Sequence, residues 1–162
     1  MTPLPTHRGE QPPPPLHLRG VTEGDLEALA LLEREIFPEE PYPYFVLRQM
    51  YDLHPGHLLV LDDGTALKGY VLVATPPDDG PSWVLGLGIT RDERGRGHGR
   101  RLMREALRRL RADGVREVCL TVDPANLAAI VLYESLGFTA DEGVRKDYFG
   151  PGADRLVMRR SL

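Results

Sequence analysis

The sequence predicts one α/β domain whose mixed sheet contains one parallel crossover. Short apolar runs typical of strands recur along the chain, and two segments with helical spacing alternate with them in the second half. Strands that alternate with helices in this way favour a parallel connection within the sheet. With 162 residues, 41% of them apolar and 27% charged, the chain is long enough to bury about two-thirds of its unfolded surface.

The chain divides into a tail and one domain. Residues 1–15 are rich in proline and nearly free of large apolar side chains, which predicts a flexible or extended tail. No internal repeat or linker divides residues 16–162, so we expect a single domain there.

Apolar periodicity and turn residues predict the elements of the first half. Thr22 and Asp25 form a start resembling a capping box, with Asp in place of the usual Glu or Gln. The proline-rich stretch 37–43 ends that helix, and Asp62–Thr65 is a hairpin turn. We expect strands at residues 16–19, 58–61, 67–74 and 82–89, and helices at 22–36 and 44–53.

The second half contains the two helices that alternate with strands. An apolar stripe runs along the first helix, which Gly114 is placed to cap at its C-terminal end. Gly137 ends the second helix in the same way. We expect helices at residues 97–112 and 126–136, and strands at 117–122, 138–144 and 155–159.

The net charge of -4 conceals a basic segment. Between Arg91 and Arg116 there are ten arginines against four acids, a local charge of +6, whereas the rest of the chain has twenty acids against ten bases. A basic island in an acidic protein favours a local anion site over a nucleic-acid stripe, so no nucleic-acid partner is expected. A solvated helix face is the alternative interpretation.

Several classes of protein are not expected. No apolar run approaches the roughly 20 residues that span a bilayer, and the N-terminus does not look like a secretory leader, so we expect a cytoplasmic protein. Cys119 is the only cysteine, which excludes an intramolecular disulfide and a cysteine-based zinc site. His54 and His57 lie in a proline-glycine turn with no evident third ligand, so we expect no metal.

A glycine-rich loop precedes the first of the two late helices. The run from Arg94 to Arg100 reads RGRGHGR, and its glycines would let the backbone approach a ligand closely. A helix N-terminus adds about half a positive charge, which favours a phosphate group. The spacing of the glycines fits neither the dinucleotide fingerprint nor the Walker A loop.

A second segment follows about thirty residues later, and the pair resembles the GNAT superfamily of N-acetyltransferases. Arg94, Gly97 and Gly99 match its pyrophosphate loop. Its second acetyl-CoA motif is matched by Asn126, Ala129, Leu132, Tyr133, Gly137 and Phe138. The C-terminal half is most similar to RimI-type N-terminal protein acetyltransferases, on the run LYESLGF and on residues 145–149.

The resemblance implies a mixed, mostly antiparallel sheet with a parallel central pair and about four helices. It also implies an enzyme that uses acetyl-CoA as co-substrate, in which an amine attacks the thioester directly. Tyr133 matches the tyrosine that protonates the departing thiolate, and Asn126 matches a residue that contacts the cofactor. The strand that pairs with pantetheine is matched by Leu87, Gly88 and Ile89, and the pyrophosphate loop by Arg94, Gly95, Arg96, Gly97, His98, Gly99 and Arg100.

One departure from the RimI pattern bears on the acceptor. Where those enzymes have a general-base glutamate, this chain has Thr121, which cannot accept a proton at neutral pH. Glu35, Glu39 or a chain of waters is the alternative general base. Acids gather near the first helix and its following loop, where they would attract a cationic amine: Glu33, Glu35, Glu39, Glu40 and Asp52. A solvated helix face is again the alternative.

The acceptor groove implied by the resemblance would include Glu39, Glu40 and Tyr148. The preferred acceptor is the α-amine of a protein or peptide. A small-molecule amine such as an aminoglycoside, polyamine or amino acid is a second possibility, and a non-catalytic acyl-CoA-binding module is a third.

Overall fold

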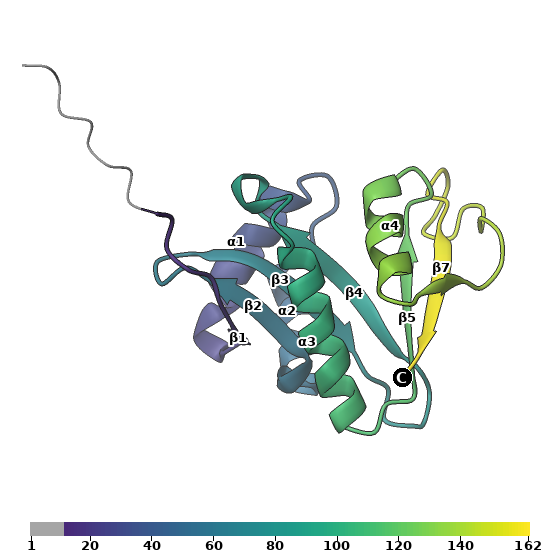
Figure 1. The fold of residues 1–162 in the computed structure, drawn as a ribbon, viewed down its shortest axis with the longest axis horizontal. Coiled ribbons are helices and arrows are strands. Elements are labelled where there is room, and N and C mark those ends of the chain that lie inside the picture. Colours follow the sequence, from purple (N-terminus) through teal and green to yellow (C-terminus); the bar gives the residue numbers. More distant parts are fainter. Residues whose placement is uncertain (1–11) are drawn as a thin grey trace, which may run out of the picture.

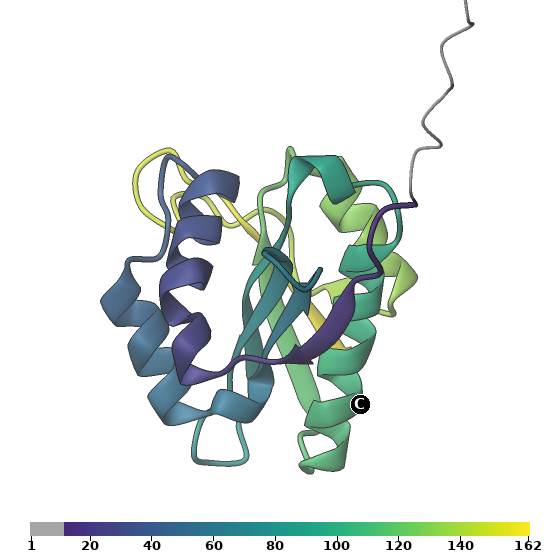
Figure 2. The same ribbon diagram turned by 90° about the vertical axis from the view of Figure 1, so that its left-hand side faces the viewer.

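The computed structural model describes residues 12–162 and consists of one sheet covered by helices on both faces (Figure 1). The tail predicted at residues 1–15 lies largely outside the described residues, and residues 12–15 are exposed and have no regular secondary structure. Figure 2 shows the layers edge-on, with α1 and α2 on one side of the sheet and α3 and α4 on the other. None of the helices in the described part of the chain is both long and apolar enough to cross a membrane.

Most of the predicted elements are present at nearly the expected positions. The helices are α1 Leu26–Ile36, α2 Tyr44–Leu53, α3 His98–Ala112 and α4 Leu127–Ser135. The strands are β1 His17–Gly20, β2 Leu58–Asp62, β3 Leu67–Ala74, β4 Ser82–Ile89, β5 Glu117–Val122, β6 Thr139–Ala140 and β7 Leu156–Ser161. Short 3-10 turns lie at Glu23–Asp25, Pro55–His57 and Arg91–Glu93.

The sheet has the predicted mixed topology. Its seven strands are ordered β1-β2-β3-β4-β5-β7-β6, and every pair is antiparallel except β4 with β5. That parallel pair is short, running only from Ser82 opposite Val118 to Val84 opposite Leu120. Helix α3 makes the crossover between these two strands.

Two apolar cores lie on the two faces of the sheet. On one face α1 and α2 bury Leu26, Leu29 and Leu47 against Tyr70 of β3. On the other face α3 packs its apolar stripe against the sheet, and α4 adds Tyr133. Each large apolar side chain buried in this way contributes roughly 1.5–3 kcal/mol, so the two cores hold all four helices on the sheet.

The start of the first helix forms the predicted capping box. The backbone N–H of Thr22 donates to the Asp25 carboxylate at 2.7 Å. The same carboxylate accepts from the Arg19 guanidinium at 2.6 Å, which ties the end of β1 to the turn that opens α1. The hydrogen bond from Arg19 lowers the pKa of Asp25 to about 2.

The predicted strand at residues 138–144 is wrong beyond Ala140. Strand β6 covers only Thr139–Ala140, and residues 141–154 form an irregular loop with one isolated bridge, Arg145 to Arg155. Residues 141–144 are all exposed, so no apolar surface would be buried by extending the pairing. Left-handed backbone at Gly150 and Gly152 turns the chain back into β7.

Candidate active site

The divergence of β4 and β5 creates the central feature of the site (Figure 1). The two strands pair only as far as Val84 and Leu120, so among the described residues the segment Leu85–Ile89 has no partner strand on its β5 side. Apart from the carbonyls of Leu85 and Ile89, which accept from Tyr42 and Arg94, the backbone N–H and C=O groups along this edge are therefore available to a ligand that lies between the strands.

The predicted pantetheine strand lies on this edge. Gly88 is buried and faces Tyr70 of β3, and a Cβ atom at Gly88 would lie 2.9 Å from the Tyr70 ring and hydroxyl. Glycine is therefore required at this position because the aromatic side chain of Tyr70 occupies the space. Leu87 and Ile89 are partly buried and pack against the core on the α3 side.

The glycine-rich loop connects β4 to α3 and exposes the N-terminus of that helix. Gly95 and Gly97 have φ values of 75° and 81°, a left-handed conformation that favours glycine. The first helical hydrogen bond of α3 joins Arg101 N to Gly97 O, so the amides of His98, Gly99 and Arg100 precede it and point out of the helix end. This is the arrangement in which a helix terminus binds a phosphate.

Glu93 organises the charged side chains of this loop. Its buried carboxylate lies 3.3 Å from both Arg96 Nη1 and His98 Nε2, which offsets part of the charge of Arg96. Arg94 turns back toward the strand and donates from Nε to Ile89 O at 3.1 Å. The loop is therefore held by its own side chains, while its backbone amides stay available.

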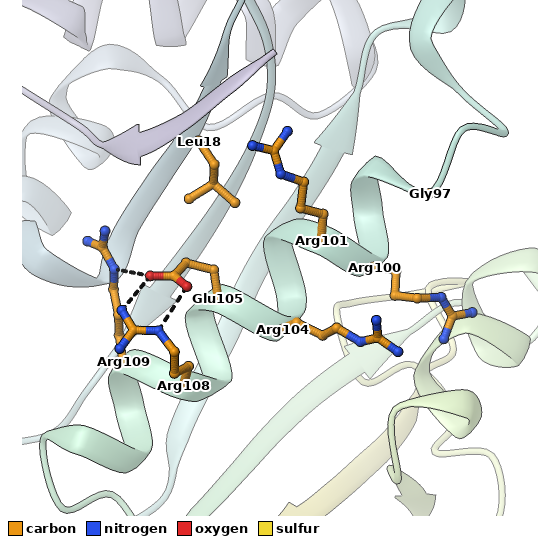
Figure 3. A pocket seen from close by; sticks show the side chains of 8 residues that line it. All are labelled: Leu18, Gly97, Arg100, Arg101, Arg104, Glu105, Arg108 and Arg109. Atoms are coloured by element: carbon orange, nitrogen blue, oxygen red, sulfur yellow. Dashed lines mark hydrogen bonds and ion pairs between the residues drawn. The ribbon is translucent and has the colours of Figure 1, made fainter. Parts of the chain in front are cut away.

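Arg100, which is partly buried, begins a row of arginines along α3 (Figure 3). Its Nη1 donates to Ser135 Oγ of α4 at 2.7 Å, which joins the two helices. A groove of about 540 Å³ runs along one side of α3, lined by Leu18, Gly97, Arg100, Arg101, Arg104, Glu105, Arg108 and Arg109. The basic segment thus begins at the predicted phosphate loop and continues along the surface of the helix.

Tyr133 lies in α4 with its ring buried and its hydroxyl unpaired. Its ring packs edge-on against Phe138 with centroids 6.0 Å apart. The hydroxyl makes no hydrogen bond to any residue between 12 and 162, and it is not among the fully enclosed polar atoms. Burial raises the pKa of Tyr133 to about 12, so the phenol is protonated at neutral pH. It can donate its proton to an acceptor that reaches this position.

Asn126 lies at the start of α4, and Thr121 lies within β5. Asn126 caps α4, and its side-chain oxygen accepts from Ala129 N at 3.2 Å. Thr121 lies in β5 opposite Val157 and is partly buried. Cys119, on the same strand, is buried, and the burial raises the pKa of its thiol, so it is not activated as a nucleophile.

Glu33 does not belong to the exposed acids of the predicted groove. It is only 3% exposed, because α1 turns it toward the sheet. There its carboxylate accepts from the Tyr70 hydroxyl and, at 3.1 Å, from Tyr42 N. The Tyr42 hydroxyl donates to Leu85 O at 3.1 Å. Leu85 is the first residue of β4 that no longer pairs with β5. The α1–α2 loop is thus anchored to the edge of β4.

The role of Tyr42 was not predicted from the sequence. It lies in a proline-rich stretch, and nothing in that stretch indicates which side chain reaches the sheet. The carboxylate of the buried Glu33 accepts from the backbone N–H of Tyr42. Burial, together with the charge of Glu33, raises the pKa of the Tyr42 hydroxyl.

The remaining predicted groove residues lie on loops. Glu39 and Glu40 are exposed on the α1–α2 loop. Tyr148 is exposed on the β6–β7 loop, where Arg145 stacks over its ring at 5.6 Å. Figure 2 shows this yellow loop on the same side of the sheet as the α1–α2 loop. The two loops therefore border the face of the sheet opposite α3.

Comparison with known proteins agrees with this geometry. Residues 25–138 match the family described as Acetyltransferase (GNAT) family. The N-alpha-acetyltransferase RimI of Mycobacterium tuberculosis is 34% identical over 152 residues, which cover 90% of this chain and 92% of that protein. A mycothiol acetyltransferase of Thermobispora bispora is 52% identical over 62 residues, but these cover only 38% of this chain and 21% of that protein.

Solved structures share the fold. The ribosomal-protein-S18-alanine N-acetyltransferase from Escherichia coli superposes with a TM-score of 0.76 at 22% identity, covering 90% of this chain and 93% of that one. The ribosomal-protein-alanine N-acetyltransferase from Brucella melitensis gives a TM-score of 0.75 at 26% identity, covering 91% of this chain and 100% of that one. The chain therefore belongs to the GNAT family and is an N-acetyltransferase, an enzyme of the class that takes its acetyl group from acetyl-CoA.

Proposed function

We propose that this enzyme acetylates the α-amine of a peptide or protein N-terminus, with acetyl-CoA bound between β4 and β5. The observation that carries the proposal is that the free edge of β4, the glycine-rich loop and Tyr133 lie close together. The free edge of β4 leads into the glycine-rich loop. That loop packs on α4 at Gly99, where a Cβ atom would lie 3.4 Å from Leu132. Tyr133 is the next residue along α4.

Each part of the cofactor has a chemically matched partner. The pantetheine arm extends the sheet along Leu87–Ile89, where it takes the place of a strand partner. The pyrophosphate lies on the amides that open α3, whose left-handed glycines allow a close approach. Asn126, at the start of α4, has a side-chain amide group left over from capping with which to contact the cofactor.

The reaction follows from this arrangement. The neutral amine attacks the thioester carbonyl carbon, and the carbonyl oxygen becomes an oxyanion that accepts from a backbone N–H of β4, a contact worth roughly 3 kcal/mol. The C–S bond then breaks, and the thiolate takes the proton of the Tyr133 hydroxyl. The proton that leaves the attacking nitrogen returns to the phenolate through solvent, so the enzyme ends unchanged.

The burial of Tyr133 suits this role. The low polarity that raises its pKa to about 12 also disfavours a bare thiolate in the same place. Proton donation at the moment the C–S bond breaks avoids that buried anion.

The side chain at position 121 supports the α-amine as the acceptor. A lysine side chain has a pKa of about 10.4 and an α-amine one of about 7.8. Holding each neutral at pH 7.5 therefore costs the lysine about 3.5 kcal/mol more. Thr121 supplies no carboxylate to remove that proton, so the α-amine, which is already partly neutral, is favoured.

The two loops that border the far face of the sheet supply the acceptor groove. Glu39 and Glu40 are exposed and attract the cationic form of the amine on arrival. Tyr148 offers an aromatic face and a hydroxyl from the opposite loop. An acceptor site between two loops suits an extended peptide.

Matched peptides test the acceptor. One peptide has a free N-terminus and no lysine, and the other has the same sequence with a blocked N-terminus and one internal lysine. We expect acetylation of the first to be at least tenfold faster in kcat/KM. Faster acetylation of the blocked peptide would overturn the proposed acceptor. Binding of acetyl-CoA without turnover on any amine would instead point to an acyl-CoA-binding module.

A small-molecule amine is the second candidate function, and the likeness to mycothiol acetyltransferases favours it. That likeness covers only part of the chain, and 21–29% of those relatives. A panel of small amines measured beside the peptides separates the two acceptors. Turnover on a small amine with neither peptide acetylated would establish the second candidate.

A further inference from the structure

A second group of chemically reactive side chains lies at the opposite end of α3 from the glycine loop. His54 directly follows α2, His57 ends the 3-10 turn before β2, and Asp113 directly follows α3. One potential ligand atom from each residue can be chosen so that all lie within 4.8 Å of one another. A helix of fifteen residues is about 22 Å long, so this group is well separated from the proposed acetyl-CoA site.

The group combines residues from separate parts of the sequence. The two histidines are close neighbours in a His-Pro-Gly-His turn, but their third partner follows 56 residues after His57. The fold brings it there because α3 runs back along the sheet and ends beside the turn (Figure 1). For this reason the sequence shows no third ligand near the two histidines, and the structure supplies Asp113.

We propose that His54, His57 and Asp113 form a site for a divalent ion of the zinc type. Two imidazole nitrogens and one carboxylate oxygen are ligands that zinc prefers, and a water would complete a tetrahedral shell. The group has no place in acetyl transfer, so the ion would serve the fold by joining α2, β2 and α3.

His57 is already oriented as a ligand. It is 3% exposed, and its Nε2 faces the Asp113 carboxylate at 2.6 Å. Its other nitrogen, Nδ1, lies 2.8 Å from Thr75 Oγ1, which in turn contacts Ser82 Oγ at 2.9 Å. A histidine that binds a metal usually donates its second N–H to such a neighbour, which fixes the ring and its tautomer.

Arg109 is the cation nearest to this group. Its Nη1 lies 3.5 Å from Gly56 O in the same turn, but its charge is partly offset by an ion pair with Glu105 at 3.0 Å.

Binding requires two small adjustments. Tetrahedral zinc at about 2.1 Å from each ligand atom sets neighbouring ligand atoms roughly 3.4 Å apart, so Asp113 must withdraw slightly from His57. Its side chain is 52% exposed, which leaves it room to do so. The rings of His54 and His57 are stacked at 3.5 Å, and the partly exposed His54 must turn to direct a nitrogen at the ion.

Zinc titration of the full-length protein tests the site. The protein is freed of any polyhistidine tag, stripped with a chelator, and titrated with zinc chloride in a calorimeter. We expect one ion per chain and a melting temperature raised by about 5 °C when free zinc exceeds the dissociation constant about a hundredfold. Cobalt chloride should give the visible absorption of tetrahedral cobalt.

The variants that test the site replace the two more exposed ligands, because replacing the buried His57 can unfold the protein. Loss of zinc binding in these variants can then be assigned to the missing ligand. His54→Ala and Asp113→Asn should each weaken zinc binding at least tenfold and remove the rise in melting temperature. His17→Ala and Asp79→Asn, at exposed positions elsewhere, are the matched controls and should bind as the wild type does. No binding up to about 0.1 mM zinc, or binding that neither ligand variant weakens, would overturn the site.

Discussion

Burial of Tyr133 keeps its hydroxyl protonated, and the same hydroxyl has no hydrogen-bond partner among the described residues. The ring is held by Phe138, and the hydroxyl is not used by any residue in the described part of the chain. Tyr133→Phe keeps the ring and removes the proton, so we expect kcat to fall by ~10² while the affinity for acetyl-CoA changes less than twofold.

Steady-state kinetics with calorimetry of acetyl-CoA binding measures both quantities. Tyr51→Phe, which removes a partly buried phenol from α2, is the matched control and should keep wild-type turnover. An unchanged kcat in Tyr133→Phe, under conditions where chemistry limits the rate, would exclude Tyr133 from the mechanism.

Gly97 is required for its backbone conformation rather than for lack of space. Apart from its chain neighbours, no atom of residues 12–162 lies within 4 Å of a Cβ built there, but its φ of 81° strains any other residue. Gly97→Val should therefore fold, shift the loop, and weaken acetyl-CoA binding at least tenfold in calorimetry. Gly143→Val, on an exposed loop with equal space, is the control. Wild-type affinity in Gly97→Val would show that the loop does not hold the cofactor.

At the scale of single elements, the start of α1 depends on one carboxylate. Asp25 accepts from Thr22 and from Arg19, and the pKa of this carboxyl is lowered from 3.8 to about 2. Because the pKa of Asp25 is lower in the folded than in the unfolded protein, the ionised carboxylate stabilises the fold at pH values above the unfolded pKa. That stabilisation is lost as the pH falls from about 4 toward 2.

Asp25→Asn should lower the free energy of unfolding by about 1 kcal/mol at pH 7, the usual worth of a cap. The difference between variant and wild type should shrink as the pH falls toward 2. Urea unfolding at several pH values measures it, with the exposed Asp79→Asn as control. A difference that grows in acid would contradict the assignment.

At the scale of the whole molecule, the elements that bury apolar surface could be predicted from the sequence. Helix α3 and strands β3 to β5 match their expected bounds within a residue, because their patterns of apolar residues have a definite period. The loop at 141–154 could not be predicted in this way, since exposed residues carry no such pattern. The loop before α3 could also be predicted, because the glycine run from Arg94 to Arg100 is a pattern within one short segment.

Contacts between distant residues explain what the sequence could not predict. Glu33 looks like an exposed helix acid, and only the fold directs it to Tyr70 and Tyr42. Asp113 lies far from His57 in sequence and meets it only because α3 returns along the sheet. In both cases the partner is determined by tertiary structure rather than by spacing along the chain.

Amide hydrogen exchange with and without acetyl-CoA tests the location of the active site most directly. We expect bound acetyl-CoA to slow exchange at Leu87–Ile89 on the free edge of β4 and at His98–Arg100 at the start of α3. Exchange at the last turn of α3 and at the turn containing His57 should not change. Protection confined to other segments, with Leu87–Ile89 and His98–Arg100 exchanging as they do without acetyl-CoA, would contradict the proposed site.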